Sequence, residues 1–180
     1  MQAPQDVLDF WFTEHGPDDW FAGKPELDAA IVARFAATHA AIARGEGFTW
    51  RSTIDGRLAE IIVLDQFSRQ IHRGTAAAFA SDGMALVLAQ EAVGLGLDSL
   101  LDTHRRQFLY MPYEHAESLV VQAQSIRLFH ALGDPEMMKF ANWHLEVIQK
   151  FGRFPKRNAA LGRTSTAAEI AYLESDAHPF

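Results

Sequence analysis

The 180-residue sequence contains no cysteine. This absence excludes disulfide bonds, thiolate nucleophiles and cysteine-held zinc or iron–sulfur sites, and it gives no sign of an oxidising compartment. Residues 1–6 show neither the basic nor the apolar region of a signal peptide. No apolar run approaches the roughly 18 to 20 residues that span a bilayer. We therefore expect a cytoplasmic protein without a membrane partner.

Signals for β-strands are also missing. The sequence has no alternating runs of β-branched residues, and Asp55-Gly56 and Asp82-Gly83 precede helical patterns instead of closing hairpins. The length suits one domain, and the 48% of hydrophobic residues can fill one core. The sequence thus predicts a single compact all-α domain over residues 1–180.

Proline, glycine and capping residues predict seven principal helices. Pro25 begins one helix and Gly45 ends it, whereas Asp134-Pro135 supplies an N-cap and a first-turn proline. Gly152 is the expected C-terminal cap of the helix that follows Asp134. The predicted helices cover approximately residues 6–14, 25–45, 53–73, 81–95, 112–133 and 134–151, with a last helix after 166.

Positive charge is concentrated in residues 150–163. The protein carries a net charge of −7, yet this stretch has five cations and no acid: Lys150, Arg153, Lys156, Arg157 and Arg163. Phe151 and Phe154 lie between the charges, which indicates a packed cationic surface. Because the protein as a whole is acidic, we do not expect a nucleic acid as its partner.

This basic segment has three interpretations. In the first, Arg153, Arg157 and Arg163 bind phosphate or carboxylate together with free N–H groups of the last helix. In the second, the arginines pair with acids elsewhere in the chain, and Glu169 closes the helix start in a capping box with Thr166. In the third, the segment faces a partner protein.

One helix face carries an apolar stripe that continues directly into charge, through Leu58, Ile62, Asp65, Arg69 and His72. An ordinary solvated face would lie opposite the stripe. We therefore expect Asp65 and Arg69, four residues apart, to form a partly buried pair. The pair either holds helices together or also lines a site.

A second polar pattern follows Pro112, the expected first residue of a helix. His115, Ser118, Gln122 and Ser125 would form one stripe on this helix. Such a stripe either packs against another helix or floors a polar cavity. In a cavity, His115 would be the candidate proton carrier, since its ordinary pKa lies near physiological pH. Glu114 and Glu117 would favour the positive end of the helix dipole.

Other chemistry is weakly indicated. No histidine stands four residues from another, so we expect neither a metal site nor a cofactor. His144 shares an apolar face with Phe140, Val147 and Phe151, which is typical of a core histidine. The sequence has no serine nucleophile elbow and no glycine-rich phosphate loop.

Four blocks of the sequence resemble a bacterial family, domain of unknown function 924. They are residues 7–12 (Val-Leu-Asp-Phe-Trp-Phe), 64–67 (Leu-Asp-Gln-Phe) with Arg69 and Arg73-Gly74, 110–113 (Tyr-Met-Pro-Tyr) with Glu117, and 151–155 (Phe-Gly-Arg-Phe-Pro) with Arg157-Asn158, Leu161-Gly162-Arg163 and Ser165-Thr166. The resemblance implies an all-α fold similar to tetratricopeptide-like antiparallel arrays, and no established activity. Ser68, His72 and Lys156 depart from the family's commoner proline, aromatic residue and histidine.

Two classes of function follow. The first is a cavity that binds a small anion such as phosphate or a carboxylate, with hydrolytic or proton-transfer chemistry open. Its candidate residues are Asp65, Gln66, Arg69, Arg73, His115, Glu117, Gln122, Arg153, Arg157, Asn158 and Arg163. The second is a non-catalytic helical scaffold with a groove for a peptide or protein. We expect a monomer or a homodimer in either case.

Overall fold

The computed structural model describes residues 1–175, which form helices and turns without a β-strand. The α-helices are α1 (Pro4–Asp9), α2 (Pro17–Trp20), α3 (Pro25–Ala43), α4 (Ile54–Ile62), α5 (Ser68–Ile71), α6 (Asp82–Gly94), α7 (Thr103–Glu114), α8 (Leu119–Leu132), α9 (Pro135–Phe151) and α10 (Ala167–Glu174). Two π-helical turns, η1 (Phe10–Glu14) and η3 (Val63–Phe67), and the 3₁₀ turns η2 (Phe48–Ser52), η4 (Ala76–Phe79), η5 (Leu97–Leu100) and η6 (Pro155–Arg157) complete the fold. The predicted all-α class is confirmed.

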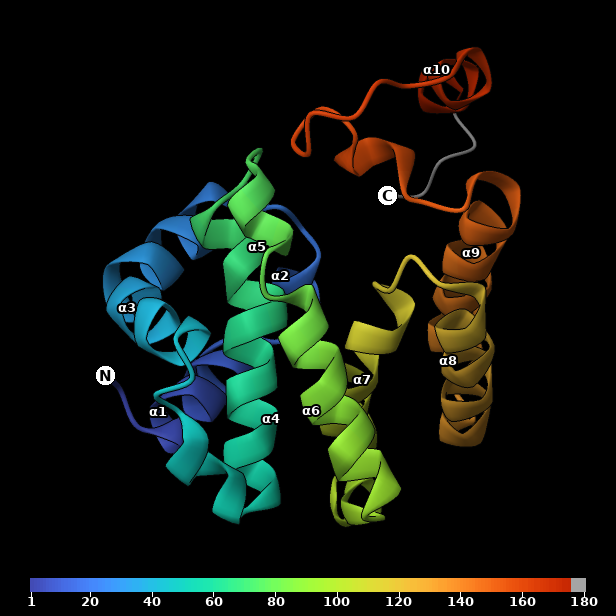
Figure 1. Cartoon of the computed structure of the whole chain (residues 1–180). Helices are drawn as coiled ribbons and strands as arrows, with labels where there is room; N and C mark the ends of the chain where they lie inside the picture. The colour runs from blue at the N-terminus through green and yellow to red at the C-terminus, as the bar shows by residue number, and fades with distance from the viewer. Residues whose placement is uncertain (176–180) are drawn as a thin grey trace.

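A central rod organises the molecule. Elements α4, η3 and α5 follow one another without a break, with α3 on one side and α6 and α7 on the other (Figure 1). Helices α8 and α9 pack as a pair beyond α7, and the chain then crosses the top of the molecule to α10 (Figure 1). The likeness to tetratricopeptide-like arrays stays a prediction.

The main core surrounds the rod. Large aromatic side chains from distant segments, Phe10, Trp11, Phe35, Phe67 and Phe108, are at most 1% exposed. Neighbouring rings meet mostly edge to face, with the Trp11 and Phe108 centroids 5.5 Å apart. Burying each such side chain stabilises the fold by about 1.5–3 kcal/mol. The rod is therefore held in place on all sides.

Several predicted helix boundaries are confirmed. Pro25 is the first residue of α3, and the Asp134 carboxylate accepts hydrogen bonds from the Glu136 and Met137 N–H groups at 2.9 and 3.1 Å. Gly152 ends α9 in the left-handed conformation, with φ of 71°, which a residue with a side chain adopts rarely. The predicted helix over 53–73 corresponds to the central rod.

The prediction of one helix over 112–133 is wrong. Helix α7 begins at Thr103, where the Asp102 side chain accepts from the Arg105 N–H at 2.9 Å, and Pro112 lies in its last turn. A proline this near the end removes a single helical hydrogen bond, and burial of its neighbours, Phe108 among them, offsets the loss. The chain then turns, and α8 begins at Leu119.

Residues 76–94 are long and apolar enough, by length and composition alone, to cross a membrane, contrary to the prediction that no segment is. In the fold this stretch is η4 followed by α6, and its two acids are engaged. Asp82 contacts Arg69 and Arg157, and Glu91 accepts a hydrogen bond from Arg57 at 2.6 Å. The segment is thus a packed part of the helical fold.

Candidate functional site

A cavity of about 670 Å³ lies between α2, α3, α5, α7 and α9. Its apolar lining residues include Trp20, Phe21, Leu27, Met111, Met137 and Phe140. Its polar lining residues include a group that we call the polar wall: Gln66, Arg69, Gln70, Glu114, His115 and His144. This volume, and the mixture of an apolar wall with a few polar groups, is typical of small-molecule sites.

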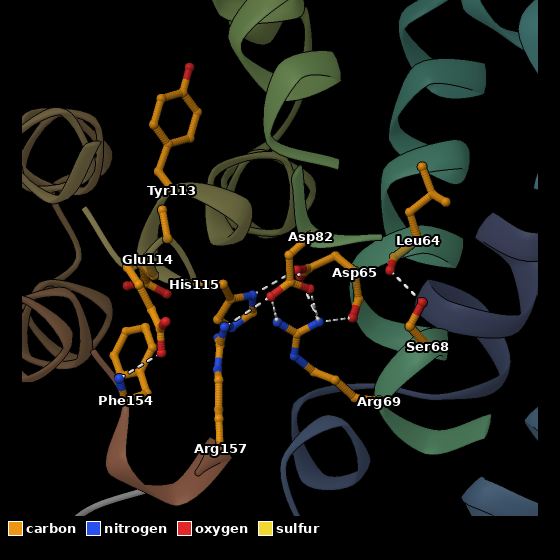
Figure 2. Close-up of polar contacts among 12 residues, drawn as sticks. Leu64, Asp65, Ser68, Arg69, Asp82, Tyr113, Glu114, His115, Phe154 and Arg157 are labelled. Carbon is orange, nitrogen blue, oxygen red and sulfur yellow. Dashed lines mark hydrogen bonds and ion pairs between the residues drawn. The ribbon is translucent and has the colours of Figure 1, made fainter. Parts of the chain in front are cut away.

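Asp65 and His115 form a close pair behind the polar wall. The Asp65 side chain is 1% exposed, and its Oδ1 lies 2.7 Å from His115 Nδ1. Gln66 Nε2 donates to the other Asp65 oxygen at 2.6 Å. The π-helical turn η3 carries both Asp65 and Gln66, a local geometry that often accompanies functional sites. Figure 2 shows His115 and Asp65 pointing toward one another.

Two arginines and one further acid surround this pair, and the arginines balance the charges of Asp65 and Asp82. Arg69 Nη1 lies 3.3 Å from Asp65 Oδ1 and 3.1 Å from Asp82 Oδ1. Arg157 Nη1 contacts Asp82 Oδ2 at 3.1 Å, so four residues from three segments meet in one network (Figure 2). The predicted partly buried Asp65–Arg69 pair is confirmed.

The network sets the protonation of Asp65 and His115. Burial alone would raise the pKa of Asp65, but Arg69 and His115 hold it below its ordinary value. Burial and the charge of Arg69 lower the pKa of His115, and Asp65 only partly offsets them. His115 is therefore neutral at pH 7. Because an ionised carboxylate only accepts, Nδ1 carries the ring proton and Nε2 is left as an acceptor.

Glu114 occupies a very different environment from the predicted one. It is the last residue of α7 and is 3% exposed, so its carboxyl group lies at the negative end of a helix. Burial, followed by the charge of Asp65, raises its pKa well above the ordinary value. Among residues 1–175, neither carboxyl oxygen receives or makes a hydrogen bond, and Oε1 is fully buried. Glu114 is thus a buried carboxyl group on the cavity wall whose protonated form is favoured.

The predicted polar stripe is divided between two helices. His115 follows α7, whereas Gln122 and Ser125 are buried on α8. The Gln122 amide donates to the backbone carbonyl oxygens of Glu114 at 2.6 Å and Ala116 at 2.9 Å. These are C-terminal carbonyl groups that the helix itself cannot satisfy. Gln122 therefore holds the end of α7, and with it the two residues on the cavity wall.

Most of the arginine-rich segment pairs internally. Arg153 Nε donates to Glu169 at 2.6 Å, and Arg163 Nη1 donates to Glu117 at 2.7 Å. Buried Asn158 accepts from Arg163 Nε at 2.9 Å. The structure brings Arg157 to the central network, but neither Arg157 nor these five side chains are part of the cavity lining.

Two N–H groups at the start of the last helix are engaged by side chains. Thr166 accepts from the Glu169 N–H at 3.2 Å, and the Glu169 carboxylate accepts from the Thr166 N–H at 2.7 Å. The capping-box prediction is confirmed, and the Glu169 carboxylate already stands at the helix start, where an added anion would meet a like charge.

Sequence reasoning missed part of the wall. It placed His144 in the core, whereas His144 lines the cavity with its ring centroid 5.9 Å from that of His115, and burial lowers its pKa to about 3. It omitted Gln70, which carries no distinctive motif, and gave Glu114 only a helix-dipole role. Lys156 also lines the cavity. Its replacement of the family's commoner histidine was the feature of the sequence that could have pointed to this position. No group of three or more His, Asp and Glu residues in the described chain is placed to hold a metal ion.

Comparisons with known proteins agree with this architecture. The family model described as a bacterial protein of unknown function (DUF924) matches residues 7–177. This chain belongs to that family. A solved structure of a protein of unknown function from Agrobacterium tumefaciens is similar, with 37% sequence identity and a TM-score of 0.90, over 95% of this chain and 96% of that one. No curated protein matches the sequence.

Proposed function

We propose that the cavity binds a small molecule and that His115 accepts a proton from it or from a neighbouring water molecule. The observation that carries this proposal is the 2.7 Å contact between buried Asp65 and His115, whose ring lines the cavity. Asp65 fixes the tautomer that leaves Nε2 as the acceptor of the ring. A neutral histidine held in this way is suited to general-base catalysis.

Direct attack by a nearby serine is disfavoured. Ser68 is fully buried, and its hydroxyl donates to the Leu64 carbonyl oxygen at 2.6 Å. His39 Nε2 lies 2.7 Å from the same hydroxyl, and it must be the donor because the hydroxyl proton is already used. Ser68 is therefore not activated. Hydrolysis or proton abstraction at His115 is the chemistry that this arrangement supports.

We also propose that the ligand carries an anionic group, a carboxylate or phosphate, that is recognised at the mouth of the cavity. Lys156 and Arg73 line this mouth. Arg73 pairs with Asp28 at 2.7 Å, whereas Lys156 makes no ion pair with the described residues. Lys156 is thus the cation best placed to meet a ligand anion, and Arg69 lies deeper in the same cavity.

Thermal unfolding in the presence of phosphate, succinate and 3-phenylpropionate tests this proposal. A ligand that binds only the folded protein raises the melting temperature by mass action, by about 2.7 kcal/mol of stability at a hundredfold excess over Kd. Lys156→Ala should reduce the shift, and Arg153→Ala, outside the cavity, should not. Equal shifts for Lys156→Ala and wild type would contradict the anion site, and no shift with any compound would contradict ligand binding.

A helical scaffold that binds a peptide or protein is the second candidate. Exposed apolar side chains outside the cavity favour it, with Leu100 at 70% and Val120 at 71% exposure. Capture of one stoichiometric partner whose binding Val120→Asp abolishes would support this function over the first. For both candidate functions we propose a cytoplasmic monomer or homodimer that needs no cofactor and binds neither a membrane nor a nucleic acid.

A further inference from the structure

The polar wall of the cavity presents hydrogen-bond acceptors that lack donors. Glu114 Oε1 and Gln70 Oε1 are buried without a hydrogen bond. The Gln66 amide nitrogen is engaged by Asp65 Oδ2 and the Met111 sulfur, which leaves its oxygen as the group without a partner among the described residues. His115 Nε2 is a further acceptor. A ligand that satisfies the glutamine and histidine acceptors must therefore donate hydrogen bonds, as must one that meets Glu114 in its ionised form.

Among the described residues around Glu114, no positive charge is left to balance its ionised form. Asp65 and Asp82 are balanced by Arg69 and Arg157, and the histidines on this wall, His115 and His144, are neutral. An ionised Glu114 would add one negative charge to this buried cluster. The carbonyl end of α7 increases the negative potential at the same place. A positive ligand group beside Glu114 would remove the imbalance.

The apolar lining residues of the cavity suit the remainder of such a ligand. They include Trp20, Phe21 and Phe140 together with methionine side chains. An apolar or aromatic body would be buried there, and aromatic faces also attract an ammonium group. The cavity thus offers apolar surface for an apolar body and acceptors for a group that donates hydrogen bonds.

We infer that the polar wall binds the ammonium group of an amine with an apolar body, and that Glu114 gives up its proton when the amine enters. The protonated carboxyl group and the ammonium ion become a carboxylate–ammonium pair, and one proton passes to the solvent. This inference rests on the proposed function, because it requires the same cavity to bind a small molecule. The anionic group recognised near Lys156 and the amine here would make the natural ligand a zwitterion.

Three compounds with related bodies and different head groups test the inference: phenethylamine, 2-phenylethanol and 3-phenylpropionate. Affinity is measured by calorimetry at pH 7, and proton release by an indicator dye in a weakly buffered solution. We expect phenethylamine to bind about tenfold more tightly than the alcohol. We expect wild-type protein to release about one proton per amine bound, in keeping with linkage.

Variants of two neighbouring acids supply the control. Glu114→Gln should abolish proton release and weaken amine binding about tenfold, while alcohol binding stays unchanged. Glu117→Gln, three residues later and paired with Arg163, should alter neither quantity. Proton release is measured on the wild-type protein, so the test stands even where the Glu114 variant fails to fold.

Two results would overturn the inference. If the alcohol or the carboxylate binds but the amine binds no better and releases no proton, the ammonium site is refuted while the proposed small-molecule site stands. If none of the three compounds binds at millimolar concentration, the inference and the proposed function for this class of ligand fail together.

Discussion

The arginine-rich segment and the cavity wall are opposite kinds of polar surface. In the segment, Arg153 and Arg163 each meet a carboxylate at close range, with Glu169 and Glu117 as partners. On the wall, the Oε1 atom of Glu114 is buried and has no hydrogen bond with the described residues. The region richer in charge is thus the better satisfied one.

This difference indicates which of the two regions is the better candidate for a ligand site. A dense run of like charges in the sequence can be neutralised by acids that folding brings to it, as Glu117 and Glu169 are here. A buried polar atom without a partner costs stability and therefore calls for an explanation, such as a ligand. The comparison favours the wall at Glu114 and His115 over the basic segment.

The largest effect is expected for Arg69→Ala. The substitution removes the cation that pairs with buried Asp65 and one of the two cations that pair with Asp82. Breaking such a buried pair costs about 3 kcal/mol of unfolding free energy. Urea unfolding measures it. Arg73→Ala, whose pair with Asp28 is at the surface, is the matched control and should cost less than about 1 kcal/mol. Equal losses in the two variants would show that the central network is not buried in solution.

Gln122→Ala should have the next largest effect, about 2 kcal/mol, because it orphans carbonyl groups at the end of α7. Gln124→Ala, on the same helix and without a described hydrogen bond, serves as the control in the same urea experiment. Because Gln122 also holds Glu114 and His115 in place, its loss should weaken ligand binding. Unchanged stability would show that solvent satisfies those carbonyl groups instead.

Glu114→Gln and Glu117→Gln should show opposite pH dependence, followed by urea unfolding between pH 4 and 8. The pKa of Glu114 is raised, so its contribution is fully present below 4.5 and is lost as pH rises through the folded-state pKa. Relative to wild type, Glu114→Gln should therefore become more stable as pH rises.

Glu117 behaves in the reverse manner. Burial would raise its pKa, but hydrogen bonds from Arg163 and the Phe154 N–H hold it below its ordinary value. Its stabilisation is present above 4.5 and is lost as pH falls through the folded-state pKa. The deficit of Glu117→Gln should therefore be greatest at neutral pH. If the unfolding free energies of the two variants changed with pH in the same way, the two carboxyl groups would not have the opposite pKa shifts that distinguish the segment from the wall.

Arg153→Ala should have the smallest global effect. It removes the partner of Glu169 and should loosen α10, which hydrogen exchange of residues 167–174 measures. Exchange in the central rod should stay unchanged, and so should ligand-induced thermal shifts. Loss of an anion-induced shift in this variant would instead restore the first interpretation of the basic segment.

Sequence reasoning succeeded where the physics is local. The box of Thr166 and Glu169, the cap at Asp134 and the pair of Asp65 and Arg69 each depend on residues within one or two helical turns. It failed at Pro112, because a proline is tolerated both at the start of a helix and near its end. That single reading assigned Glu114 to the wrong end of a helix and so reversed its electrostatic environment.

The sequence by itself determined the helical class, most helix ends and the charged residues that had to find partners, because hydrophobic period, capping and charge act over short stretches of chain. Only the tertiary structure decided which partners they found. Asp65 and His115 are 50 residues apart, and Arg157 reaches Asp82 across 75. Contacts at such separations depend on how whole helices pack, and the same packing decides which polar atoms remain facing an open cavity.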